Sequence, residues 1–194
     1  MSDVSKLSLK ELRHRSEKYL NKGRIAHVHG CEEEAAALAK RWGISERTAA
    51  EAGILHDITK RLNPEEHLDL CRKYGIDNDG REMQEPKLMH AKTGAAFARD
   101  LFGISDEVYE AIRWHTTGKP AMTTLEKIIY LADYIEPTRD FEGVEKLRKL
   151  AYEDLDKAME LGLKMSIDEI TARGDDPFEI TRRAYEYYAG GETC

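Results

Sequence analysis

The chain has 194 residues, of which 41% are hydrophobic and 35% are charged, a length and composition typical of one globular domain. No run approaches the ~18 consecutive apolar residues that a membrane helix needs, and residues 1–6 lack the start of a signal peptide. We therefore expect neither a membrane span nor secretion. The net charge of −7 argues against the basic surface of a nucleic-acid-binding protein, although a locally positive pocket could still bind a small anion.

The cysteines point to a reducing compartment. The chain has three of them, Cys31, Cys71 and Cys194, with no CxxC spacing. An odd number without a pairing pattern does not suit a disulfide framework. The sequence therefore favours a cytoplasmic protein with free thiols.

Helix-start and helix-stop signals recur along the first half of the chain. Ser8 and Glu11 form a capping box, and Gly43 is a C-terminal stop signal. The third segment, 46–58, carries so little polar surface that we expect it to be central and buried. The helices predicted in this half span residues 9–21, 24–42, 46–58 and 64 to about 75.

The second half continues the helical pattern after a polar stretch over 77–86, which reads as a loop. Thr123 and Glu126 form another capping box, and residues 116–120 read as a compact loop because of their Gly and Pro. Valine occurs only four times and no segment alternates with period two, so strands are not expected. The fold class is therefore all-α, with further helices over 88–101, 106–115, 124–135, 143–173 (broken near Tyr152) and 177–189.

Histidines and aspartates fall on apolar helix faces. His56 and Asp57 end the most apolar helix, and Asp133 interrupts the apolar run of 128–135. A single such His is more often a hydrogen-bonded core residue than a ligand, but a buried carboxylate costs several kcal/mol unless it is paired or binds metal. Six His and Asp side chains on inward faces, with few inward Lys or Arg to neutralise them, favour a metal site. Imidazole and carboxylate ligands together suit Fe, Mn or Ni, with Zn possible.

Five segments of the sequence resemble the HD-domain phosphohydrolase pattern and, more narrowly, its YqeK-type branch of symmetrical diadenosine tetraphosphate hydrolases. They are 24–28 (RIAHV), 56–60 (HDITK), 90–91 (HA), 115–118 (HTTG) and 132–137 (ADYIEP). The resemblance covers residues 24 to 141 and keeps the complete order H…HD…H…H…D. It implies a single domain over 1–194, an HD-domain helical bundle with its core at about 24–141 and a C-terminal helical extension at about 143–189.

The resemblance also implies a centre of two divalent transition-metal ions. His27, His56, Asp57 and Asp133 would hold one ion, and Asp57 would bridge to a second that is held by His90 and His115. We expect iron, with manganese, cobalt, nickel or zinc as alternatives. Two ions 3.5–4 Å apart can share a hydroxide nucleophile and hold a phosphoryl oxygen, so Asp57 is a candidate catalytic residue as well as a ligand.

Candidate substrate contacts lie next to these ligands in the sequence. Lys60 could act in catalysis and bind a phosphate, or be a solvated cation at a helix end. Arg139 could bind phosphate with two hydrogen bonds, or be an exposed loop arginine. Thr116, Thr117 and Gly118 could donate hydroxyl or backbone hydrogen bonds, or serve only the turn.

The function implied is metal-dependent hydrolysis of diadenosine tetraphosphate at its central anhydride, which yields two ADP. Two alternatives remain open. One is an HD phosphohydrolase for a guanosine polyphosphate, a deoxynucleoside triphosphate or a nucleoside monophosphate; the other is a non-catalytic nucleotide- or metal-binding domain. The expected partner is a nucleoside polyphosphate, with no nucleic acid and no membrane, and a homodimer is the candidate assembly.

Overall fold

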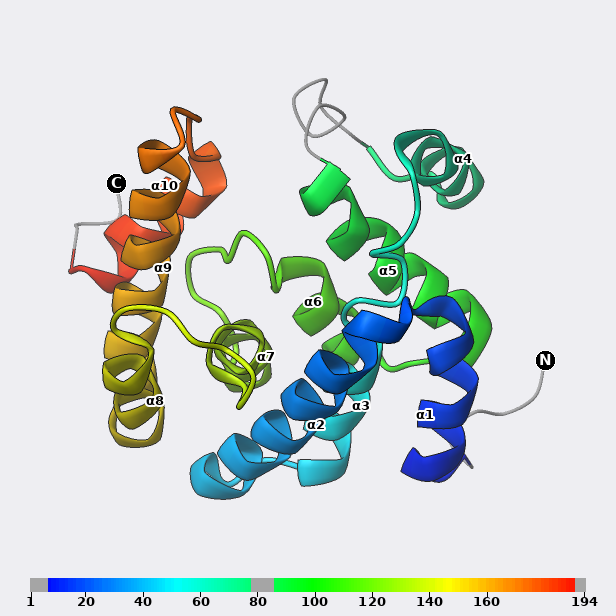
Figure 1. The fold of residues 1–194 in the computed structure, drawn as a ribbon, viewed down its shortest axis with the longest axis horizontal. Coiled ribbons are helices and arrows are strands. Elements are labelled where there is room, and N and C mark those ends of the chain that lie inside the picture. Colours follow the sequence, from blue (N-terminus) through cyan, green and yellow to red (C-terminus); the bar gives the residue numbers. More distant parts are fainter. Residues whose placement is uncertain (1–6, 78–85, 191–194) are drawn as a thin grey trace.

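The computed structural model describes residues 7–77 and 86–190 (Figure 1). Every regular element in these two stretches is a helix, which confirms the predicted all-α class. None of the helices in these stretches has the length and apolar character required to cross a bilayer. Most of the loop predicted at 77–86 lies outside the described residues.

The described residues 7–77 form four α-helices and one 3₁₀ turn. Ser8 and Glu11 form the predicted capping box, and Gly43 ends the second helix in the left-handed conformation. Two predicted helices are shorter than expected, because the first continues only as a 3₁₀ turn and the third ends three residues early. The elements are α1 (Leu9–Ser16), η2 (Glu17–Tyr19), α2 (Lys22–Trp42), α3 (Glu46–Leu55) and α4 (Pro64–Tyr74).

The described residues 86–190 form six helices. The long helix predicted over 143–173 is broken at Asp154, whose extended backbone ends one helix while its side chain accepts hydrogen bonds from the amides of Asp156 and Lys157. This N-cap starts a new helix in a changed direction. The elements are α5 (Pro86–Phe102), α6 (Asp106–Trp114), α7 (Thr124–Ile135), α8 (Val144–Glu153), α9 (Leu155–Ala172) and α10 (Glu179–Tyr188).

Helix α7 lies in the middle of the bundle (Figure 1). It contacts α2, α3 and α6 on one side and α8 and α9 on the other. A helix that is covered on all sides must be apolar all round, and α7 buries Ile128, Ile129, Tyr130 and Leu131 together. Each such side chain contributes about 1.5–3 kcal/mol by leaving water. Asp133 therefore leaves α7 from within the apolar core.

Helices α2 and α3 approach each other closely at Gly53. A Cβ atom at this position would lie 2.9 Å from Cα of Glu32 and 3.0 Å from the carbonyl oxygen of Cys31, which is closer than real Cβ contacts allow. The glycine thus lets the end of α3 lie against α2. This contact brings His56, which follows α3, to His27 on α2.

Candidate metal centre

The six predicted ligands come from five different parts of the bundle and converge on one buried place. His56, Asp57, His90 and His115 are at most 2% exposed, and His27 is 6% exposed. His27 lies on α2, His90 on α5 and Asp133 on α7, whereas His56 and Asp57 lie in the turns after α3 and His115 caps α6. The helix predicted over 46–58 included His56 and Asp57, but α3 ends at Leu55, so both residues lie just beyond it.

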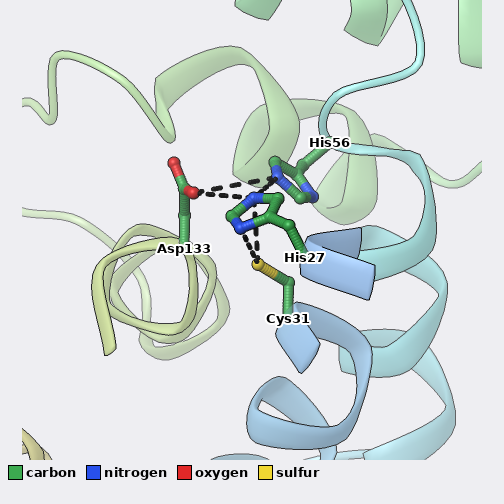
Figure 2. Close-up of side chains that lie close together, drawn as sticks. All are labelled: His27, Cys31, His56 and Asp133. Atoms are coloured by element: carbon green, nitrogen blue, oxygen red, sulfur yellow. Dashed lines mark hydrogen bonds and ion pairs between the residues drawn. The ribbon is translucent and has the colours of Figure 1, made fainter. Parts of the chain in front are cut away.

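His27, His56 and Asp133 form the first group (Figure 2). Nε2 of His27 lies 3.3 Å from Nε2 of His56 and 3.1 Å from Oδ1 of Asp133. Oδ2 of Asp57 is 3.7 Å from Nε2 of His27 and 3.4 Å from Nε2 of His56. Four possible ligand atoms, from α2, α7 and the turns after α3, thus face a common point.

His90 and His115 form the second group around the other oxygen of Asp57. Oδ1 of Asp57 lies 3.1 Å from Nε2 of His90 and 3.8 Å from Nε2 of His115. The two Nε2 atoms are 3.1 Å apart. Each carboxylate oxygen of Asp57 therefore faces its own pair of imidazoles.

Three of the imidazoles are held in the orientation that a metal ligand needs. Nδ1 of His56 and Nδ1 of His115 lie 2.7 Å and 2.6 Å from the carbonyl oxygen three residues earlier, and Nδ1 of His27 lies 3.0 Å from Oε1 of Glu136. Carbonyl and carboxylate oxygens only accept hydrogen bonds, so these Nδ1 atoms donate. In the neutral rings the lone pair of Nε2 then points into the cluster, as in histidines that bind metal.

The protonation states also suit a metal ion. Burial lowers the pKa of His90 to about 3 and lowers the pKa of His115, so both rings are neutral near pH 7. Burial alone would raise the pKa of Asp57, but the surrounding imidazoles, His56 first, hold it well below its usual range. Hydrogen bonding and charge from His27 and His56 outweigh burial in the same way and hold the pKa of Asp133 well below its usual range. Burial alone would lower the pKa of His56, but the charges of Asp57 and Asp133 raise it. The cluster thus presents ionised carboxylates together with the neutral rings of His90 and His115.

Two buried atoms of the cluster have no hydrogen-bond partner, Oδ1 of Asp57 and Nδ1 of His90. Burying a carboxylate oxygen without a hydrogen bond costs free energy. The inward-facing Nε2 lone pairs are acceptors as well, so they cannot form hydrogen bonds with one another. A divalent cation would satisfy the carboxylate oxygen and these lone pairs at once. The residues present therefore fit a divalent metal ion.

Residues 24–138, more than half of the chain, match the family model described as HD domain. The chain belongs to the HD-domain family. A Bacillus subtilis protein named bis(5'-nucleosyl)-tetraphosphatase, symmetrical, is 36% identical over 89% of this chain and 92% of its own length. A protein of the same name from Halalkalibacterium halodurans is 39% identical over 86% and 89%. A crystal structure from Clostridium acetobutylicum, described as a predicted HD superfamily hydrolase involved in NAD metabolism, has a TM-score of 0.90 and 34% identity and covers 96% of this chain and 99% of that one.

Three cations surround the ligands of this HD domain. Nη2 of Arg24 lies 2.5 Å from Oδ2 of Asp57. Nζ of Lys60 lies 3.1 Å from Nε2 of His90 and 3.4 Å from Oδ1 of Asp57. Nη2 of Arg139 lies 2.7 Å from Oδ1 of Asp133. All three cationic side chains are partly exposed, so each can neutralise a ligand carboxylate while it also faces an incoming anion.

The HTTG segment leaves the metal centre directly after His115. Thr116 and Thr117 line a separate pocket together with Trp114 and Arg183. Gly118 is buried and has a φ of +64°, and a Cβ there would lie 3.1 Å from Cδ2 of Leu163. The structure therefore does not bring Gly118 to the ligand cluster, and the predicted substrate contacts of this segment stay predictions.

Sequence reasoning gave no role to Glu136, although the residue lies within the matching ADYIEP segment. Its buried carboxylate accepts hydrogen bonds from N and Oγ1 of Thr138 at 2.7 and 2.5 Å as well as facing His27. The signal available in the sequence was a carboxylate at the end of an apolar helix, three residues after Asp133. Glu136 fixes the ring of a candidate ligand.

Sequence reasoning counted Cys31 among the cysteines of a reducing compartment, yet its thiol lies 3.4 Å from Nε2 of His27 (Figure 2) and belongs to the first group of possible metal-binding side chains. The thiol donates a hydrogen bond to the carbonyl oxygen of Ala132. Burial, together with the charges of Asp133 and Asp57, raises the pKa of Cys31 well above its usual range. The neutral thiol is therefore favoured in the metal-free protein, whereas a metal ligand is a thiolate.

Proposed function

We propose that this protein is a metal-dependent phosphohydrolase that cleaves diadenosine tetraphosphate symmetrically into two ADP. The observation that carries the proposal is the buried His/Asp cluster on an HD scaffold. It is supported by relatives that bear the name of a symmetrical tetraphosphatase and align with this chain over nearly all of their length. The acidic overall charge does not oppose an anionic substrate, because cations gather at the cluster itself.

The proposed cofactor is a pair of divalent ions, with iron as the expected metal. His27, His56 and Asp133 would hold one ion and His90 and His115 the other. Asp57 would bridge the two, since its two oxygens face the two groups separately. When bound, such ions activate water and polarise phosphoryl oxygens.

The cationic side chains around the proposed ligands would bind the substrate or position a ligand. Lys60 and Arg139 would bind phosphate oxygens next to the bond that breaks, where negative charge develops in the transition state. Arg24 would hold Asp57 through their 2.5 Å contact. The departing ADP is a good leaving group, so a strong general acid is not required.

Product analysis tests the proposal directly. The protein is reconstituted anaerobically with iron and supplied with diadenosine tetraphosphate, and the nucleotides are separated by chromatography. ADP as the sole nucleotide product supports the proposal. ATP with AMP would contradict the symmetrical cut, and faster hydrolysis of a guanosine polyphosphate, a deoxynucleoside triphosphate or a nucleoside monophosphate would favour another HD phosphohydrolase. Metal binding without hydrolysis of any of them would favour a binding domain.

A cytoplasmic location and a homodimer belong to the same proposal. The first is supported by Cys31, a buried free thiol of the kind that persists in a reducing compartment. The second stays a sequence-based prediction, which the mass of the protein in solution would test. A monomeric mass would contradict it without affecting the proposed chemistry.

A further inference from the structure

A pocket of about 790 Å³ lies beside the metal centre. Its inner wall includes Asp133 and Arg139, and its outer wall comes from α9. Figure 1 shows that the segment connecting α7 to α8 runs alongside α9. The pocket therefore joins a candidate metal ligand of the HD core to a helix beyond residue 138, where the family match ends.

We infer that this pocket binds one nucleoside of the polyphosphate substrate, with the phosphate chain running from it to the metal centre. The inference rests on the proposed function, because it takes the substrate to be a nucleotide. The volume lies within the range of small-ligand pockets, about 300–1,000 Å³. The C-terminal helical extension would then take part in nucleotide recognition.

One wall of the pocket suits a planar base. Phe141, Leu161 and Met165 line it with apolar surface. The ring of Phe141 meets the ring of Tyr134 edge to face, with centroids 5.7 Å apart, and Tyr134 is stacked in turn on the buried Tyr130 at 5.9 Å. An aromatic ring that is supported from the core offers a rigid surface on which any base can stack.

The connection between α7 and α8 is shaped to keep α9 close. Gly143 has a φ of +89°, a conformation that side chains disfavour, and a Cβ at this position would collide with the methyl group of Met165. A glycine adopts this positive φ without strain and leaves room for the end of the Met165 side chain. Met165 thus packs against the turn and lines the pocket.

The charges of the pocket match the two ends of a nucleotide. Arg139 lines the pocket while it bonds Asp133, so a cation lies where the pocket meets the metal centre. Lys146 adds a second, exposed cation. Asp168 and Glu169 on α9 provide exposed carboxylates, which repel phosphate but accept hydrogen bonds from ribose hydroxyls or an exocyclic amine. The phosphates are thus directed toward Arg139 and the nucleoside toward α9.

The test compares two ligands that differ by the nucleoside. The dissociation constants of ADP and of inorganic pyrophosphate are measured calorimetrically on the metal-loaded full-length protein. Phe141→Ala removes the ring and Met165→Trp fills the pocket, while Thr171→Trp places the same bulky side chain on an exposed position of α9 outside the lining. We expect ADP to bind about tenfold more weakly to the first two variants, with pyrophosphate binding and metal content unchanged. The Thr171 variant should match the wild type.

Several results would overturn the inference. One is a wild-type protein that binds ADP no more tightly than pyrophosphate. Another is a pocket variant whose affinities for ADP and pyrophosphate fall equally. The third is a folded Met165→Trp protein that keeps full affinity for ADP. Circular dichroism checks folding, and Met165→Trp carries the test if Phe141→Ala does not fold. Failure of the proposed function is a separate outcome: a protein that binds ADP through this pocket but does not split diadenosine tetraphosphate would refute only that function.

Discussion

Nδ1 of His27 lies 3.0 Å from Oε1 of Glu136, and this contact decides which way the imidazole faces. Removing such a partner of a metal-bound histidine typically costs about 10–100-fold in metal affinity. Glu136→Ala should therefore weaken metal binding by about that factor, and Glu136→Gln by less, since its amide oxygen still accepts a hydrogen bond. A competition titration with a metal-sensitive dye measures the affinity. Glu153→Ala, at an exposed glutamate of α8, should leave it unchanged.

Gly30 offers an independent way to disturb the same contact. A Cβ at Gly30 would lie 2.5 Å from Oε2 of Glu136, so Gly30→Ala must displace that carboxylate. We expect metal affinity to fall while Glu136 itself is intact. Wild-type affinity in a folded Gly30→Ala protein would show that the position of Glu136 does not matter.

Binding of both metal ions should depend on Asp57, whereas His115 should be needed for only one of them. Asp57 faces both groups, one with each carboxylate oxygen, whereas His115 contacts its Oδ1. Asp57→Ala should lose both metal ions, and His115→Ala should lose mainly the second. Elemental analysis after anaerobic reconstitution gives the number of ions per chain. A wild-type protein with fewer than two equivalents would contradict the dinuclear centre.

Lys60 and Arg139 should act on the substrate and not as ligands, because a protonated amine or guanidinium has no lone pair for a metal. Replacing either by Ala should lower kcat/KM by about 10²-fold, the typical cost of losing one group that stabilises developing charge. The metal content should stay intact, which elemental analysis checks. Lys149→Ala, at an exposed lysine of α8, is the matched control. Full activity in either variant would identify that residue as a solvated cation.

The helix boundaries show what sequence reasoning could reach. Start signals at Ser8 and Thr123 were predicted correctly because each depends on a local hydrogen bond to the first turn. The ends of α3 and α6 were placed too late. There Nδ1 of His56 or His115 lies close to the carbonyl oxygen three residues earlier, a contact that depends on how the site is assembled and not on propensity.

Polar residues on apolar faces, such as Asp133 on α7, pointed to a buried cluster, and the resemblance to the HD-domain pattern supplied the full set of candidate ligands. The groups around them could not be named in this way. Arg24 contacts a carboxylate 33 residues away and Glu136 contacts an imidazole 109 residues away. Such contacts arise from helix packing, which leaves no local periodic signal.

The close packing of α2 on α3 gives a prediction for stability. Gly53→Ala must push Cβ into the backbone of α2, which should lower the free energy of unfolding by about 1–3 kcal/mol. Gly23→Ala is the matched control, because nothing lies within 4 Å of its Cβ position; that change should raise stability by up to about 1 kcal/mol. Urea denaturation of the metal-free proteins measures both. Equal stability of the two variants would refute the close-packing argument.

The position of the broken bond can be read from the fate of an oxygen atom. Two metal ions, Lys60 and Arg139 are the proposed positive charges for a highly anionic substrate, and they should gather around the central phosphates, where charge develops in the transition state. Attack of water on a β-phosphorus with ADP as the leaving group forms one P–O bond to the water oxygen and breaks the central anhydride bond. Hydrolysis in ¹⁸O-water should therefore give two ADP, one of which carries the label on its terminal phosphate. Mass spectrometry of the products measures the label. If AMP and ATP are instead the first products, an outer anhydride bond has broken, and the symmetrical assignment fails without affecting the proposed metal centre.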